Sequence, residues 1–246
     1  NLYHLQNRRF MKEIYSFLQE LAQNNNREWF NANKPHFKEL QERFHAFAQQ
    51  LIDAVSAWDE EIAASNLTVK DCTYRIYRDT RFSKNKEPYK THMGIFICRG
   101  GKKSPYAGYY FHLEPELSLP DRAPLSMGKC FLIAGTYHFE SKVLRSIRDE
   151  ISINGDSFLD AIANASTHGF SLFEGEMLRK VPAEFAFAPD KCHHLLKQKE
   201  YALGKEIDTE YLFGENLSGR ISEDFRSAAD FVHKINMAVD FALENF

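Results

Sequence analysis

The chain has 246 residues, of which 43% are hydrophobic and 26% charged, and its formal net charge is −3. This composition is typical of globular proteins, and it excludes a disordered chain, a collagen-like fibre and a polycation that binds nucleic acid through its overall charge. The longest apolar run, from Cys130 to Ala134, is far shorter than the roughly 18 residues that a membrane-spanning helix needs.

No secretory signal pattern opens the sequence, and the cysteines are too widely spaced for a zinc motif or a disulfide scaffold. The cysteines are Cys72, Cys98, Cys130 and Cys192. We therefore expect a cytoplasmic protein with no membrane partner, in which the thiols are reduced and mostly buried.

The first third of the sequence has the apolar spacing of amphipathic helices. Apolar residues recur every three or four positions from Phe10 to Leu21, and again from Phe37 to Val55. The run 24–26 of three asparagines interrupts the pattern, because Asn favours turns and helix caps. Pro35 is acceptable in the first turn of the second helix. We predict two helices that pack as a layer.

The middle third changes to short segments that are rich in aromatic and β-branched residues. Four such segments, separated by Gly, Pro, Ser and Lys, are predicted to be strands. They are Cys72–Tyr77, Met93–Cys98, Tyr109–Leu113 and Cys130–Thr136. Because the gaps between them are too short for helical crossovers, we expect an antiparallel or mixed sheet of four or more strands within about 72–136.

After the predicted strands the sequence returns to helical patterns, over 143–151, 157–165, 189–201 and 221–239. Since no linker or repeat divides the chain, we expect one α+β domain over 1–246, with the sheet packed against the N-terminal and C-terminal helices. Its continuous core should contain Phe17, Leu21, Trp29, Phe44, Leu51, Ile95, Ile97 and either Tyr110 or Phe111.

Three segments carry a resemblance to a known family. They are Asn-Asn-Asn-Arg-Glu-Trp-Phe at 24–30, the run from Arg75 to His92 and Gly-Tyr-Tyr-Phe-His-Leu-Glu-Pro at 108–115, with a weaker match at 178–182 and 195–199. Together they resemble the bacterial domain-of-unknown-function family 2461, over about 16–205. This family has no established activity, so the resemblance implies kinship and assigns no reaction, cofactor or site residue.

Positive charge is concentrated in one part of the sequence. Residues 75–103 contain nine Lys or Arg and two acidic residues, a local charge of +7, whereas the remainder carries −10. Arginine offers a planar fork for phosphate or carboxylate groups, and lysine offers a point charge. We therefore predict an anion site at Arg75–His92. An alternative is that Arg75, Arg78 and Arg81 form internal ion pairs with acids such as Asp79, Glu114 or Glu116.

Two His-x-Glu pairs are candidates for chemistry, His112 with Glu114 and His138 with Glu140. In a strand, residues two apart share a face, so each pair could bind a metal ion, act in acid–base chemistry or form a plain sheet surface. His112 and Glu114 are the catalytic candidates, and we predict no metal site and no cofactor. The predicted ligand-binding residues are Arg75, Arg78, Arg81, Lys84, Lys90, Tyr109 and His112.

Nucleotide-binding and hydrolase motifs are absent from the sequence. Two function classes therefore remain. The first is binding, with or without catalysis, of a small phosphate- or carboxylate-bearing ligand at Arg75–His92, and whether the protein is an enzyme stays open. The second is an interaction module whose basic face docks nucleic acid or an acidic protein. The net charge of −10 on the rest of the chain disfavours nucleic acid as the partner. The sequence does not determine the oligomeric state.

Overall fold

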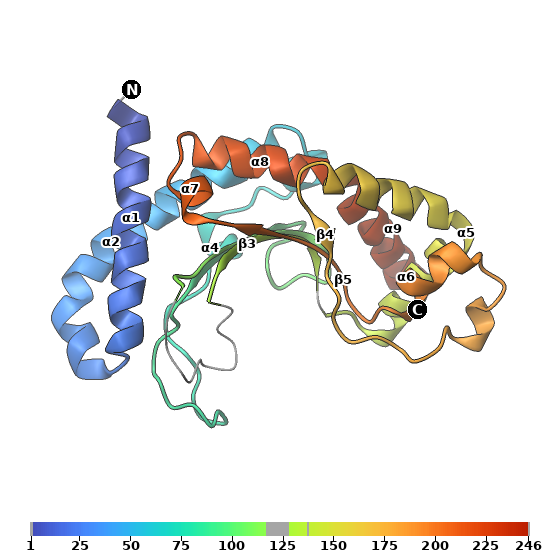
Figure 1. The fold of residues 1–246 in the computed structure, drawn as a ribbon, viewed down its shortest axis with the longest axis horizontal. Helices are drawn as coiled ribbons and strands as arrows, with labels where there is room; N and C mark the ends of the chain where they lie inside the picture. The colour runs from blue at the N-terminus through green and yellow to red at the C-terminus, as the bar shows by residue number, and fades with distance from the viewer. Residues whose placement is uncertain (1, 117–127, 137, 246) are drawn as a thin grey trace.

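The computed structural model describes residues 2–116, 128–136 and 138–245 (Figure 1). The chain begins with two long helices, α1 (Leu2–Gln23) and α2 (Arg27–Ser56), followed by the short helices α3 (Glu60–Ala64) and α4 (Val69–Cys72). Asn26 caps α2, because its side chain accepts a hydrogen bond of 3.0 Å from the Trp29 amide. The cap starts α2 before the expected position, so Pro35 lies inside the helix and not in its first turn.

Five strands of the described chain form one antiparallel sheet in the order β1-β2-β3-β5-β4. This confirms the α+β class and selects the antiparallel sheet over the mixed one. The strands are β1 (Met93–Cys98), β2 (Gly108–Leu113), β3 (Cys130–Thr136), β4 (Ser171–Leu172) and β5 (Tyr201–Ile207).

The remaining helices of the described chain follow β3. They are α5 (Ser141–Ser166), α6 (His193–Lys197), α7 (Thr209–Leu212), α8 (Leu217–Ser227) and α9 (Ala229–Asn245), with 3₁₀ turns at Ala183–Phe185 and Asp190–Cys192. The two patterns expected at 143–151 and 157–165 are one helix, which is kinked at Asn154. The pattern expected at 221–239 is divided between α8 and α9. Within the described ranges, no helix has the length and apolar character needed to cross a membrane.

Two expected elements are wrong. The strand expected at Cys72–Tyr77 is absent, because Cys72 ends α4 and the chain then folds back on itself. In this hairpin-like loop the Arg78 amide donates to the Pro88 carbonyl, and the Lys90 amide donates to the Ile76 carbonyl. The helix expected at 189–201 is also wrong, because only α6 is α-helical there and Tyr201 begins β5, which pairs with β3 along its whole length.

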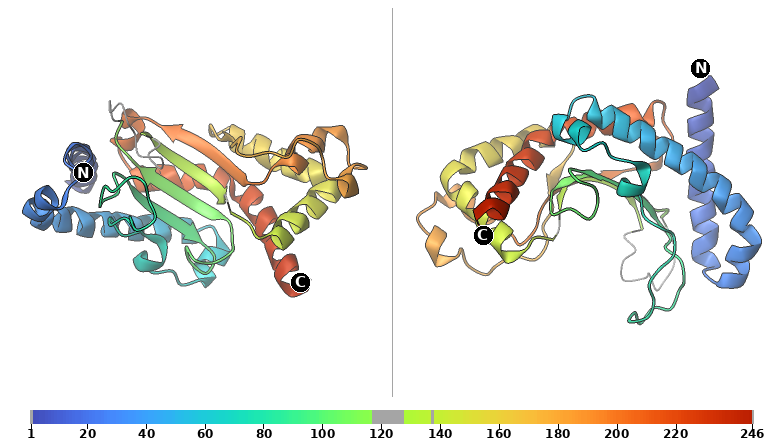
Figure 2. Two further views of the ribbon diagram at one scale, coloured as in Figure 1. Left: turned by 90° about the horizontal axis from the view of Figure 1, so that it is seen from below. Right: turned by 180° about the vertical axis from the view of Figure 1, so that it is seen from behind.

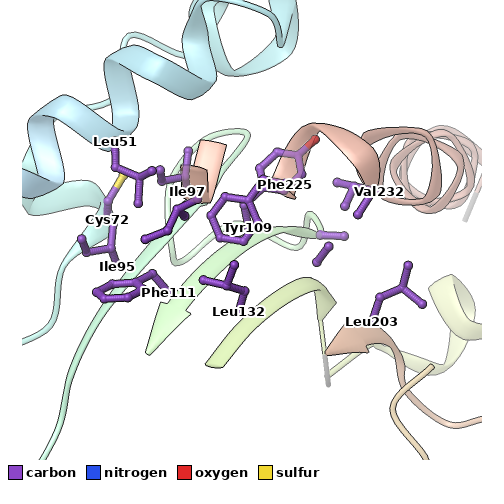
Figure 3. Close-up of a cluster of buried hydrophobic side chains, with 14 of the residues drawn as sticks. Leu51, Cys72, Ile95, Ile97, Tyr109, Phe111, Leu132, Leu203, Phe225 and Val232 are labelled. Atoms are coloured by element: carbon purple, nitrogen blue, oxygen red, sulfur yellow. The ribbon is translucent and has the colours of Figure 1, made fainter. Parts of the chain in front are cut away.

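One face of the sheet packs against helices, and the core lies between them. Figure 3 shows side chains of this core, with Leu51 of α2 above Ile95 and Ile97 of β1 and with Phe225 of α8 against Tyr109 of β2. A single cluster of buried residues extends from Phe10 to Ala242. The expected core residues Phe17, Leu21, Phe44, Leu51, Ile95, Ile97 and Phe111 are buried in it, and Trp29 packs against it while half-exposed. All four cysteines are buried free thiols.

The opposite face of the sheet is not covered by helices. Figure 2 (left) views the molecule from below, and α2 and α8 lie behind the strands in that view. A smaller cluster of Phe131, Ile133 and Ala202 lies on this face, with Tyr110 and Phe173 against it. The segment 73–92 descends on the same side (Figure 1).

Candidate functional site

A cavity of about 700 Å³ lies between the uncovered face of the sheet and the segment 73–92. Its floor is apolar and aromatic, and it consists of Phe96, Tyr110, Phe131, Ile133 and Phe173. Its wall is polar and includes Tyr74, Arg78, Asp79, Glu87, Lys90, Thr91 and His92. The volume is in the range of about 300–1,000 Å³ that is usual for small-molecule sites.

The alternation of the strands decides which side chains reach the cavity. On β2, Tyr109 and Phe111 are buried in the core, whereas Tyr110 and His112 line the cavity. On β3, Leu132 is in the core, and Phe131 and Ile133 line the cavity. Successive side chains of a strand point to opposite faces, so one strand supplies both the core and the site.

The wall is anchored to the junction between α1 and α2. Asn25 bonds both backbone groups of Tyr89, with its Nδ2 donating to the carbonyl at 3.0 Å and its Oδ1 accepting from the amide at 3.2 Å. The Tyr89 ring stacks on Phe30 of α2 at 3.9 Å between ring centroids. The asparagine run and the basic segment, far apart in sequence, are therefore in direct contact.

Two cations of the wall face the cavity without a complete set of partners. The Arg78 side chain is only 12% exposed, and its nearest carboxylate, Glu87, lies 3.6 Å away. Within the described residues, no acceptor takes a hydrogen bond from its guanidinium group and no carboxylate pairs with Lys90. Burial and the nearby Arg75 lower the pKa of Lys90, whose ammonium lies 5.5 Å from the centre of the Tyr74 ring.

A chain of hydrogen bonds connects Tyr110, His112 and Glu114. Tyr110 Oη lies 2.8 Å from His112 Nδ1, and His112 Nε2 lies 3.1 Å from Glu114 Oε2. Glu114 is fully buried, and it also accepts hydrogen bonds from the Thr91 hydroxyl at 3.1 Å and the Gly128 amide at 3.0 Å. This chain can move a proton between the cavity and a buried carboxylate.

His92 lies beside this chain. Its ring centroid is 4.7 Å from that of His112, and the ring of His112 is stacked on Phe131 at 4.3 Å. Burial, and then the neighbouring His112, lower the pKa of His92. Ligand atoms of His92, His112 and Glu114 all lie within 4.8 Å of one another, which makes them a possible metal-binding group among the described residues.

The structure brings some of the predicted site residues together and separates others. Arg78, Lys90 and His112 line the cavity, and Glu114 lies directly behind His112. Arg75, Arg81 and Lys84 are exposed and do not line it. Arg81 pairs with Asp79 at 2.7 Å, and Arg78 lies 3.6 Å from Glu87, so the alternative of internal ion pairs applies to both residues.

Tyr109 is placed differently from the prediction. It is buried on the core face, where its hydroxyl donates to Asp59 at 2.8 Å, because the alternation of β2 turns it away from His112. The second His-x-Glu pair, His138 and Glu140, does not lie on a strand. The strand β3 ends at Thr136, and Glu140 is the N-cap residue of α5.

Sequence reasoning missed Tyr110, His92 and the aromatic floor. The period of two could have identified Tyr110, because it predicts that Tyr110 and not Tyr109 shares a face with His112. No local signal could have identified His92, which reaches the site only through the fold of the segment 73–92.

Comparison with known proteins identifies a family. The family model described as "Conserved hypothetical protein (DUF2461)" matches residues 13–233, which includes the region expected from the sequence. No curated protein and no solved structure matches the chain.

Proposed function

Because the chain belongs to the DUF2461 family of conserved hypothetical proteins, a membership that assigns no reaction, we propose its function from the cavity. The protein binds a small amphipathic anion, with a phosphate or carboxylate group at Arg78 and Lys90 and an aromatic or apolar body on the floor of the sheet. The observation that carries this proposal is that two incompletely paired cations and an apolar floor line one cavity.

The charges of the wall support an anion more than a neutral ligand. The cavity is also lined by two carboxylates, but Asp79 is held by Arg81 through two side-chain hydrogen bonds of 3.0 and 2.7 Å. Glu87 lies within ion-pair distance of Arg78 without a hydrogen bond between them. Hydrogen bonds from charged donors are worth about 1.5–3 kcal/mol, so the donors that Arg78 and Lys90 retain can select a ligand.

The concave shape supports a small ligand over the alternative of a docking module. Long nucleic acids and protein partners need an exposed surface, whereas Arg78 is nearly buried at the cavity wall. The exposed cations Arg75, Arg81 and Lys84 remain available to a docking partner. Binding measurements on variants of the two sets of cations distinguish a ligand site from a docking module.

The test is calorimetric titration with phenyl phosphate and with phenylacetate. We expect Arg78→Ala and Lys90→Ala each to weaken binding by about tenfold, the loss of one charge-assisted hydrogen bond. Arg75→Ala is the matched control, because it removes a cation of the same segment that does not line the cavity, and its affinity should stay within about twofold of the wild type.

If the protein is a docking module, binding should depend on the exposed cations and not on those that line the cavity. If neither aromatic anion binds at millimolar concentration, or if Arg75→Ala weakens binding as much as Arg78→Ala, the proposed ligand site is wrong. Binding of a DNA oligonucleotide that survives physiological salt and depends on Arg75, Arg81 and Lys84 would establish the docking module in its place.

A further inference from the structure

We propose that His92, His112 and Glu114 bind one divalent transition-metal ion at the end of the cavity. Two imidazoles and one carboxylate form a ligand set that suits zinc or ferrous iron and not magnesium or calcium, which prefer oxygen ligands. The three ligand atoms lie within 4.8 Å of one another, and His92 and His112 both line the cavity.

The separation of the first two ligands fits one shared ion. His112 Nε2 and Glu114 Oε2 are 3.1 Å apart. Two ligands that are each about 2.1 Å from one metal, at bond angles of about 90–110°, are separated by about 3.0–3.4 Å. An ion bound by both atoms lies to one side of the line that joins them, and coordination displaces the proton that they share. The ligand atom of His92 lies within 4.8 Å of the other two, so it can approach the same ion.

The surrounding contacts hold the ligands in the orientation that coordination requires. A metal-bound histidine needs an acceptor for its other N–H group, and Tyr110 Oη, at 2.8 Å from His112 Nδ1, is in position to accept that hydrogen bond. Phe131 stacks on the His112 ring and fixes its plane. Thr91 and the Gly128 amide each donate to one oxygen of Glu114 and so fix the carboxylate.

Three protein ligands leave coordination positions open toward the cavity. Such an open site is typical of catalytic and not of structural zinc. Arg78 and Lys90 line the same cavity, so an anionic group bound by them has access to the open positions of the ion. The metal site itself does not depend on the anion, because its ligands are complete without Arg78 and Lys90.

The test measures zinc alone, by equilibrium dialysis of the full chain after treatment with a chelator. We expect one Zn²⁺ per chain in the wild type, and at least a tenfold loss of affinity in Glu114→Gln and in His92→Ala. The sequence offers a matched control in its other His-x-Glu pair: His138→Ala and Glu140→Gln should bind as the wild type does. Absorption of Co²⁺ in the same site should show nitrogen and oxygen ligands and no thiolate.

Thermal unfolding without metal checks that each variant folds. Glu114→Gln keeps the shape of the side chain, and His92 is only half-buried, so both variants should fold. The proposal is overturned if the wild type binds no Zn²⁺ at micromolar concentration, or if folded Glu114→Gln and His92→Ala bind it as tightly as the wild type. Because phenyl phosphate is absent, this result is independent of the anion titration.

Discussion

Gly94 on β1 provides the space that the Tyr110 ring occupies. A Cβ atom at this position would lie 2.5 Å from Tyr110 Oη and 2.6 Å from a ring carbon. We predict that Gly94→Ala displaces Tyr110, breaks its hydrogen bond to His112 and lowers the free energy of unfolding by about 1–3 kcal/mol. Urea unfolding measures the stability, and zinc dialysis measures the effect on the site.

Gly204 on β5 is the matched control for this substitution. No heavy atom lies within 4 Å of a Cβ built there, and its φ is not in the left-handed region. Gly204→Ala should change the free energy of unfolding by at most about 0.5 kcal/mol and leave zinc binding unchanged. Equal effects of the two substitutions would show that the space at Gly94 has no special role.

A second prediction at the residue scale concerns the pH dependence of Asp59 and His233. Asp59 accepts hydrogen bonds from His233 at 2.9 Å and from Tyr109 at 2.8 Å. Burial alone would raise the pKa of Asp59, but these hydrogen bonds outweigh burial and lower it. The hydrogen bond to Asp59 raises the pKa of His233, and burial opposes this effect.

The two shifts define a window of stabilisation. The contribution of His233 is complete below its unfolded pKa of about 6.5 and is lost as the pH rises through its higher folded pKa. The contribution of Asp59 is complete above its unfolded pKa of about 3.9 and is lost as the pH falls through its lower folded pKa. The free energy of unfolding of the wild type should therefore exceed that of His233→Gln by more at pH 5.5 than at pH 9. The change in this difference between the two pH values should be less than about 1 kcal/mol, because His233 is 39% exposed. Urea unfolding at both pH values measures it, and a constant difference would contradict the assignment.

At the scale of the element, the two faces of β2 can be separated by two adjacent substitutions. Tyr109→Phe removes a donor from the buried Asp59 and should cost about 1–3 kcal/mol of stability without affecting zinc binding. Tyr110→Phe removes the group that orients His112 and should weaken zinc binding by about 10–100-fold at little cost in stability. Urea unfolding and zinc dialysis on the same samples compare them, and an exchange of the two effects would refute this division of the strand.

Three strands could be predicted from the sequence because each is a short, aromatic-rich and isolated run. The structure has β1 and β3 at the predicted bounds, and β2 begins at Gly108, one residue earlier than predicted. The strand β5 could not be predicted in this way, because its Lys205 and Glu206 break the apolar pattern and its pairing with β3 decides its conformation.

The candidate site was predictable only in part, for a related reason. The charge of the segment 75–92 and the pair His112 and Glu114 are visible in the sequence, and three of the predicted ligand residues do line the cavity. Which cations face inward depends on the fold of the loop, whose backbone is set by Asn25 at a separation of 64 residues. A contact at this distance in the chain has no local signal.

At the scale of the whole molecule, the shared core predicts cooperative unfolding. Trp58, which follows α2, donates a hydrogen bond of 2.9 Å to Ser222 of α8, and both ends of the chain contribute to one buried cluster. We predict that the urea transitions followed by tryptophan fluorescence and by far-ultraviolet circular dichroism coincide. Both tryptophans lie in the N-terminal third, so separate midpoints would show that α5 and α9 unfold independently.

Because all four thiols are buried, their chemical labelling reports when the structure opens. Burial raises the pKa of Cys72 to about 12 and those of Cys98 and Cys130 to about 11, so the native chain presents almost no reactive thiolate. Iodoacetamide should therefore alkylate the chain only when it opens. Where alkylation is faster than refolding, mass spectrometry should find chains with no label or with four, and chains with one or two labels would reveal a part of the molecule that opens alone.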